Sequence, residues 1–200
     1  MVRTLFAHDD FLAAALALAA ERGPSAVTVG AITARLKAPT GSFYHRFASR
    51  DALLAELWLK TVLAFQQGIE SALGAGDGLQ AALHTPAWVR ENLIQARVLL
   101  LYHRDDFVQG EWPEALKLGV EEHRRRARTT LEKFTRETFG HAGPDEIRSA
   151  QFVVATVPVA AVREYLYRRE PPPPIVDELI RTTYHAVIEG RVLPPATGSA

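Results

Sequence analysis

The residues best suited to chemistry lie between Thr28 and Arg50, where hydroxyl, phenol, imidazole and cationic side chains occur without a single carboxylate. Thr40 and Ser42 can hydrogen-bond to either type of base edge, and the methyl group of Thr40 can contact thymine. The other polar groups suit phosphates, which fix register on DNA without carrying sequence information. The candidate DNA-binding residues are Thr28, Lys37, Pro39, Thr40, Gly41, Ser42, Tyr44, His45 and Arg50. Because neither base-reading candidate is Arg or Asn, the set predicts a DNA surface but no operator sequence.

Two short helices joined by a tight turn would position these residues. Thr28 is a good N-cap, and Val29, Ile32 and Leu36 then fall on one helical face. The pattern breaks at Lys37-Ala38-Pro39, because proline disfavours helical geometry in the residue before it but suits the start of a following helix. The chain is therefore expected to turn there.

The second helix, from Thr40, has one apolar and one polar side. Phe43 and Phe47 are four residues apart and point one way, whereas the short or hydrogen-bonding residues around them point the other way. Two such helices predict a helix-turn-helix whose second helix enters the major groove of DNA.

The same stretch resembles a known family. The run T-G-S-F-Y-H-R-F at residues 40–47, followed by A-S-R-D-A-L-L, resembles the recognition helix and next helix start of the tetracycline-repressor (TetR) family of bacterial transcription regulators. The resemblance covers about residues 5–65, and Lys37-Ala38-Pro39 stands where many members have Gly-Val-Ser. It implies an N-terminal three-helix DNA-binding domain, joined by a long helix to a helical C-terminal regulatory and dimerisation domain.

Composition sets limits on the rest of the chain. Two hundred residues, 48% of them hydrophobic, can bury one sizeable core or two smaller ones. The formal net charge is zero, which argues against a non-specific nucleic-acid binder. The first 50 residues carry six basic and three acidic side chains, and the other 150 carry 17 and 20. A basic head on a slightly acidic body is consistent with DNA binding by the head alone.

The compartment is predicted from what the sequence lacks. There is no cysteine, so disulfides and thiolate metal sites are excluded. No stretch approaches the ~20 uninterrupted apolar residues of a membrane-spanning helix, and Asp9 and Asp10 interrupt any secretory pattern. We therefore expect a soluble cytoplasmic protein without a membrane partner.

Helical periodicity continues to the end of the chain and predicts an all-α fold. The expected helices cover about residues 4–22, 50–73, 85–103, 113–139, 145–168 and 175–190, besides the two around the turn. Pro158 should kink or break the fifth of these. The predicted domains are a helix-turn-helix domain at 1–50, a helical ligand-binding and dimerisation domain at 51–193, and a disordered tail at 194–200.

The helix at 113–139 carries a run of arginines on its outer side. Arg124, Arg125, Arg126 and Arg128 lie three or four residues from glutamates. A solvated face of ion pairs is favoured over a second nucleic-acid site.

The body could be a solid core or could hold a ligand. Its candidate pocket residues combine aromatic and aliphatic groups with one titratable side chain: Trp58, Phe65, Leu100, His103, Phe107, Trp112 and Phe152. Taken one at a time, aromatic residues at helical spacing more often form core. The resemblance implies a cavity among them, since relatives bind inducers between the long linking helix and those after it. We expect a small, largely apolar effector.

An enzyme is not predicted. His103 lies near Asp105 and Asp106, but the sequence contains no HExxH, no GxSxG and no glycine-rich phosphate loop. We therefore expect no catalytic residues, no cofactor and no metal.

A homodimer is expected, because one helix-turn-helix buries too little surface for specific affinity and two-fold dimers match palindromic operators. The stretch at 145–168 is apolar on nearly every side and should be buried all round. With the helix at 175–190 it would form a four-helix bundle between two copies. The candidate interface residues are Val153, Val157, Ala161, Ile180, Tyr184 and Val187.

These observations favour a sequence-specific transcription regulator, a repressor that its ligand releases from DNA. The alternative is a helical ligand- or partner-binding protein whose DNA-binding head is vestigial.

Overall fold

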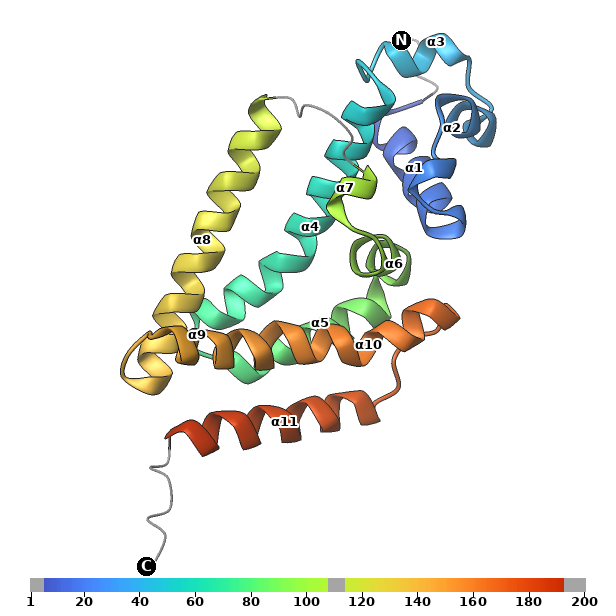
Figure 1. Cartoon of the computed structure of the whole chain (residues 1–200). Helices are drawn as coiled ribbons and strands as arrows, with labels where there is room; N and C mark the ends of the chain where they lie inside the picture. Colours follow the sequence, from blue (N-terminus) through green and yellow to red (C-terminus); the bar gives the residue numbers. More distant parts are fainter. Residues whose placement is uncertain (1–5, 108–113, 193–200) are drawn as a thin grey trace, which may run out of the picture. The chain divides into compact units, whose positions relative to one another are not determined.

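The computed structural model describes residues 6–107 and 114–192, and every regular secondary-structure element in these ranges is helical (Figure 1). The α-helices are α1 (His8–Arg22), α2 (Val29–Leu36), α3 (Thr40–Tyr44), α4 (Arg50–Gly74), α5 (Gly78–Glu91), α6 (Leu93–Leu101), α7 (Arg104–Phe107), α8 (Glu114–Phe139), α9 (Pro144–Gln151), α10 (Val157–Arg168) and α11 (Ile175–Val192). A short 3-10 turn, η1, covers Pro24–Ala26, and a π-helical segment, η2, covers Phe152–Thr156. No strand occurs within the described ranges, and the all-α prediction is confirmed.

The chain forms two compact units. The first comprises residues 1–63 and 94–120, and the second comprises residues 64–93 and 121–200. Helices α4 and α8 each contribute to both units. The predicted division at residue 50 stays a prediction, and the predicted disordered tail at 194–200 lies outside the described residues.

The core of the first unit is built on phenylalanine. Phe11 of α1 meets Phe43 of α3 edge-on, with ring centroids 6.0 Å apart, and lies 6.2 Å from Phe47. Phe43 is fully buried and Phe47 is 3% exposed, so both phenylalanines are buried as predicted. The helix itself is shorter than predicted, because α3 ends at Tyr44 and Phe47 follows it in a non-helical segment. Ile32 of α2 and Val98 of α6 are buried in the same core.

Helix boundaries in the second unit differ from the sequence prediction. A helix start at Thr85-Pro86 is wrong, because α5 begins at Gly78 and contains Pro86. Asp77 caps this earlier start by accepting a hydrogen bond of 2.8 Å from the backbone of Gln80. Proline removes one backbone hydrogen bond, but α5 is buried and packs against α10 and α11, which holds it helical (Figure 1). The predicted helix also divides at Asn92, whose backbone leaves the helical region.

The stretch at 145–168 is helical throughout but changes its winding. The π-helical segment lies directly before Pro158, which has no N–H for the carbonyl of Val154. The Val157 N–H reaches back five residues to the carbonyl of Phe152. The expectation that this stretch is buried on every side is wrong for a single chain: Val153 and Val154 are buried, but Phe152 is 44% exposed.

Two close approaches hold α5 in the second unit. The ring of His84 lies against Gly68 of α4, and its Nε2 is 2.8 Å from the Phe65 carbonyl. Burial lowers the pKa of His84 below its ordinary value, so the neutral ring donating through Nε2 suits this position. Further along, Arg90 makes a bidentate ion pair with Asp177 of α11, at 3.0 and 2.9 Å, and donates to the Pro172 carbonyl.

Gly68→Ala is expected to destabilise the protein, because a Cβ there would lie 2.1 Å from Cε1 of His84. The ring would have to move and lose its hydrogen bond, which costs about 1–3 kcal/mol. Gly74→Ala is the matched control, since a Cβ at that position would meet no atom within 4 Å and alanine favours a helix. Thermal unfolding followed by circular dichroism measures both. Equal melting temperatures for the two variants would contradict the close approach.

Candidate functional site

The turn between α2 and α3 is set by local hydrogen bonds. Thr28 caps α2 as predicted, its Oγ1 accepting from the Ala31 N–H at 3.1 Å. At the other end Lys37 adopts a left-handed backbone with φ 54°, and the Ala38 N–H donates to the Thr33 carbonyl at 2.9 Å. Glycine adopts a left-handed backbone at lower energetic cost than lysine, because it has no Cβ, so a glycine would also fit this turn. The lysine side chain is exposed and makes no ion pair with any described residue.

Helix α3 presents the remaining candidates to solvent. Pro39 is its N-cap, with an extended backbone, and its carbonyl accepts from both the N–H and the hydroxyl of Ser42. The Ser42 hydroxyl therefore already donates its hydrogen within the protein, so toward a base it can act only as a hydrogen-bond acceptor. Thr40, Gly41, Tyr44 and His45 are exposed, Tyr44 by 59%.

Two arginines, Arg46 and Arg50, hold this region in place by donating hydrogen bonds to backbone carbonyls. Arg50 donates from Nε to the Val27 carbonyl and from Nη2 to the Pro24 carbonyl at 3.0 Å, so its guanidinium ties down the segment before α2. Arg46 donates to the Ser42 carbonyl at 2.7 Å and lies over the Phe11 ring, 5.4 Å from its centroid. Arg46 also donates to the Phe6 carbonyl, 40 residues away in sequence. The long-range contacts of both arginines were missed, because acceptors 23 to 40 residues away leave no local motif.

The second unit contains a cavity of about 520 Å³ between α4, α8 and the α9–η2 stretch. Its apolar lining is Phe65, Ile69, Leu73, Ala127, Leu131, Ile147, Val154 and Ala155, and its polar lining is Gln66, Glu70, Arg128, Glu132 and Gln151. The volume is within the ordinary range for small-molecule sites.

The predicted pocket residues are not brought together here. Only Phe65 lines this cavity, whereas Phe152 borders a separate surface hollow beside Val187. In the first unit Trp58 packs on Phe107 with ring centroids 5.2 Å apart, and Phe107 is fully buried core.

The other three candidates are also accounted for individually. Leu100 is partly buried in the first unit, and His103 is exposed. The His103 N–H donates to Asp106 at 2.7 Å, which makes it a helix-start residue. Trp112 lies outside the described residues. The predicted set contains no residue of α8, because the wall of the cavity depends on how α4, α8 and η2 pack.

The predicted dimer residues fall into two groups. Val153, Ile180 and Tyr184 are buried inside the chain itself, with 1%, 1% and 9% exposure, which leaves little of them for a partner to cover. Val157, Ala161 and Val187 are partly exposed. The large exposed apolar side chains of this region are Phe152, Tyr167, Ile175 and Leu179.

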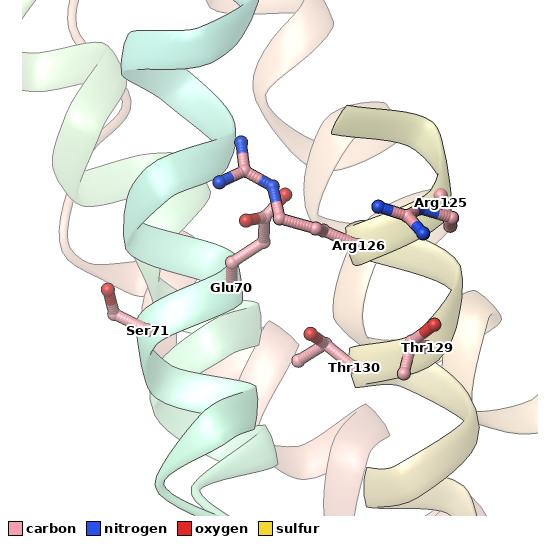
Figure 2. A pocket seen from close by; sticks show the side chains of 6 residues that line it. All are labelled: Glu70, Ser71, Arg125, Arg126, Thr129 and Thr130. Atoms are coloured by element: carbon pink, nitrogen blue, oxygen red, sulfur yellow. The ribbon is translucent and has the colours of Figure 1, made fainter. Parts of the chain in front are cut away.

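The arginine-rich side of α8 carries the predicted ion pairs in part. Arg124 pairs with Glu121 at 2.9 Å, and Arg125 pairs with Glu122. Arg126 forms no ion pair with any described residue; it reaches from α8 toward α4 over a polar hollow (Figure 2). Glu70, Ser71, Arg125, Arg126, Thr129 and Thr130 line that hollow.

Comparison with known proteins agrees with this geometry. The family model described as bacterial regulatory proteins, tetR family, matches residues 11–57. The fold resembles a tetR-family transcription regulator from Shewanella sp. PV-4, at 18% identity and TM-score 0.65, covering 93% of this chain and 96% of that one. It also resembles a TetR-like regulator from Rhodococcus sp. RHA1, at 18% identity and TM-score 0.65, covering 91% of this chain and 95% of that one. FadR from Bacillus subtilis, in complex with stearoyl-CoA, matches at 15% identity and TM-score 0.66, covering 92% of this chain and 99% of that one. No curated protein sequence matches the chain.

The fold is that of a helix-turn-helix transcription regulator. The resemblance to the tetR family is confirmed, by sequence over residues 11–57 and by fold over most of the chain. None of the helices that the structure describes has the length and apolar character needed to cross a bilayer.

Arg50→Ala should weaken DNA binding indirectly, by releasing the segment before α2. Hydrogen bonds from a charged donor are worth about 1.5–3 kcal/mol each, so the melting temperature should also fall. Arg50→Lys separates this role from phosphate contact, because lysine keeps the charge but not the forked donor geometry. We expect Arg50→Lys to resemble Arg50→Ala in both thermal unfolding and mobility shift. Full DNA affinity in Arg50→Lys would instead assign Arg50 to phosphate binding.

Proposed function

We propose that this protein is a sequence-specific DNA-binding transcription regulator that acts as a repressor, rather than an enzyme. The observation that supports this best is the segment at residues 40–47, formed by α3 and the turn after it. Phe43 and Phe47 are buried there, while Thr40, Gly41, Tyr44 and His45 are exposed. An anchored helix with a small, polar, carboxylate-free outer side fits a major groove. Residues 1–50 would form the DNA-binding domain and residues 51–193 the regulatory body of a cytoplasmic protein.

The roles of the exposed residues follow from their chemistry. Thr40 and Ser42 would contact bases, Ser42 as an acceptor only, while Pro39 and Gly41 keep the helix surface low enough for close approach. Lys37, Tyr44, His45 and the capped start of α2 at Thr28 would contact phosphates. Arg50 we assign to positioning, because its guanidinium is occupied by backbone carbonyls.

The cavity in the second unit would hold a small, largely apolar effector. Residues of α4 form one of its walls, and α4 is one continuous helix that begins at Arg50, six residues beyond α3. A ligand that favours one position of α4 would thereby favour one position of the DNA-binding domain. The coupling free energy between two such sites is about 1–3 kcal/mol in comparable proteins. The stearoyl-CoA complex of FadR shows a protein of the same fold holding a ligand with a long apolar chain.

A mobility-shift assay on DNA upstream of the protein's own gene tests the DNA-binding role. We expect a shift that weakens steeply with salt, as phosphate contacts require. Gly41→Leu should abolish it without lowering the melting temperature, because no atom lies within 4 Å of a Cβ at Gly41 and the added side chain would meet only DNA. No salt-sensitive shift would favour the alternative, a ligand- or partner-binding protein with a vestigial head.

We also propose a homodimer that binds a palindromic operator, through α10, α11 and the exposed side of η2. Phe152, Ile175 and Leu179 are exposed by 44%, 50% and 59%, and Val157, Ala161 and Val187 lie among them in the sequence of these helices. Such apolar exposure is typical of an interface between copies.

Leu179→Glu should convert the dimer to a monomer, because a buried, unpaired carboxylate is costly at an apolar interface. Light scattering at micromolar concentration measures the mass, and Glu178→Gln on the same turn is the control that should stay dimeric. A monomeric wild-type protein, or a dimeric Leu179→Glu variant, would contradict this interface.

A further inference from the structure

A buried polar cluster lies at one wall of the cavity. His123 of α8 is 6% exposed, and its Nε2 hydrogen-bonds to Oε1 of Gln66 on α4. Its Nδ1 is 3.2 Å from Oε1 of Glu70, one turn further along α4. Gln66 and Glu70 both line the cavity, so the cluster connects the interior with the site of the proposed effector.

One oxygen of Glu70 is turned toward His123. Its Oε1 is buried and has no hydrogen-bond partner within the described part of the chain. Arg126 reaches toward Glu70 across the adjoining hollow in Figure 2 but forms no ion pair with it or with any other described residue. The Glu70 side chain is nevertheless 23% exposed and lines the cavity, and a charged acceptor forms stronger hydrogen bonds than a neutral one.

The other charged residues of the lining are one cation and one anion. Arg128 and Glu132 both line it and lie one turn apart on α8, with opposite charges that offset each other. Gln151, from α9, is neutral. The lining therefore carries two carboxylates and one guanidinium, and Glu70 is the carboxylate that no cation of the lining offsets.

The rest of the lining is aliphatic or aromatic, with Phe65 and Ile69 on α4, Leu131 on α8 and Val154 on η2. We propose that this cavity selects an apolar molecule carrying a protonated amine, the ammonium group donating to Glu70 while the apolar part packs on these side chains. The inference rests on the proposed effector site and names the chemical class that it takes.

Three probes with the same apolar part and different polar ends test the selection: 4-phenylbutylamine, 4-phenylbutan-1-ol and 4-phenylbutanoate. Calorimetric titration into the full chain should give the tightest binding for the amine, about tenfold or more beyond the alcohol, and the weakest for the carboxylate. Glu70→Gln keeps the shape but removes the charge. It should lower amine affinity about tenfold and leave alcohol affinity within about threefold. Glu137→Gln, an exposed position of α8 away from the cavity, should change neither.

Each other outcome overturns a defined part. Carboxylate as the tightest ligand would move the polar end to the arginines of α8, and equal affinities for all three probes would remove the charge preference; both overturn the inference while leaving the cavity an effector site. Equal loss of all three probes in Glu70→Gln would make Glu70 structural. Binding of none of them would overturn the inference together with the proposed effector site, whereas the mobility shift still tests the DNA-binding function on its own.

Discussion

The edge-on packing of Phe43 against Phe11 is the contact on which the DNA-binding surface depends. Helix α3 is only five residues long, and a helix of that length has no stability of its own in water. Its orientation comes from Phe43 and Phe47 in the core and from Arg46, which joins the end of α3 to α1. Every exposed group on α3 is therefore placed by apolar burial on the opposite side, so that small polar side chains can remain on the outside without weakening the fold.

Helix α4 begins in the same packed core as Phe43 and Phe11. Ser49 caps its start, accepting from the Ala52 N–H at 3.0 Å, and Leu53 and Leu54 are fully buried beside Phe43 in the same core. Toward the C-terminal end of the helix, Gly68 admits the ring of His84, and Gln66 and Glu70 face the cavity. One continuous helix thus contributes side chains to both compact units, and the proposed coupling between an effector and DNA needs an element of this kind.

Sequence patterns predicted the features that depend on a few neighbouring residues. The cap at Thr28 and the buried pair of phenylalanines follow from local hydrogen bonding and from the helical repeat, and both are present. The start of α5 was misplaced because Pro86 is a strong local signal that tertiary burial overrides. The cavity wall was misplaced for a related reason: a residue's periodicity shows that it faces inward, but not which other helix it meets there.

Buried polar atoms without a hydrogen-bond partner have different explanations at different positions. Two buried side-chain oxygens lack a hydrogen-bond partner in the described part of the chain, one on Glu70 and one on Thr85. Thr85 is fully buried in α5 and lines none of the cavities described above, so its hydroxyl is a cost of packing α5 tightly. Glu70 borders the cavity of the second unit, where most of the lining is apolar, and its buried oxygen is turned toward a buried histidine. A charged residue at the wall of a mostly apolar cavity agrees with the proposed binding of an apolar ligand that carries a cationic group.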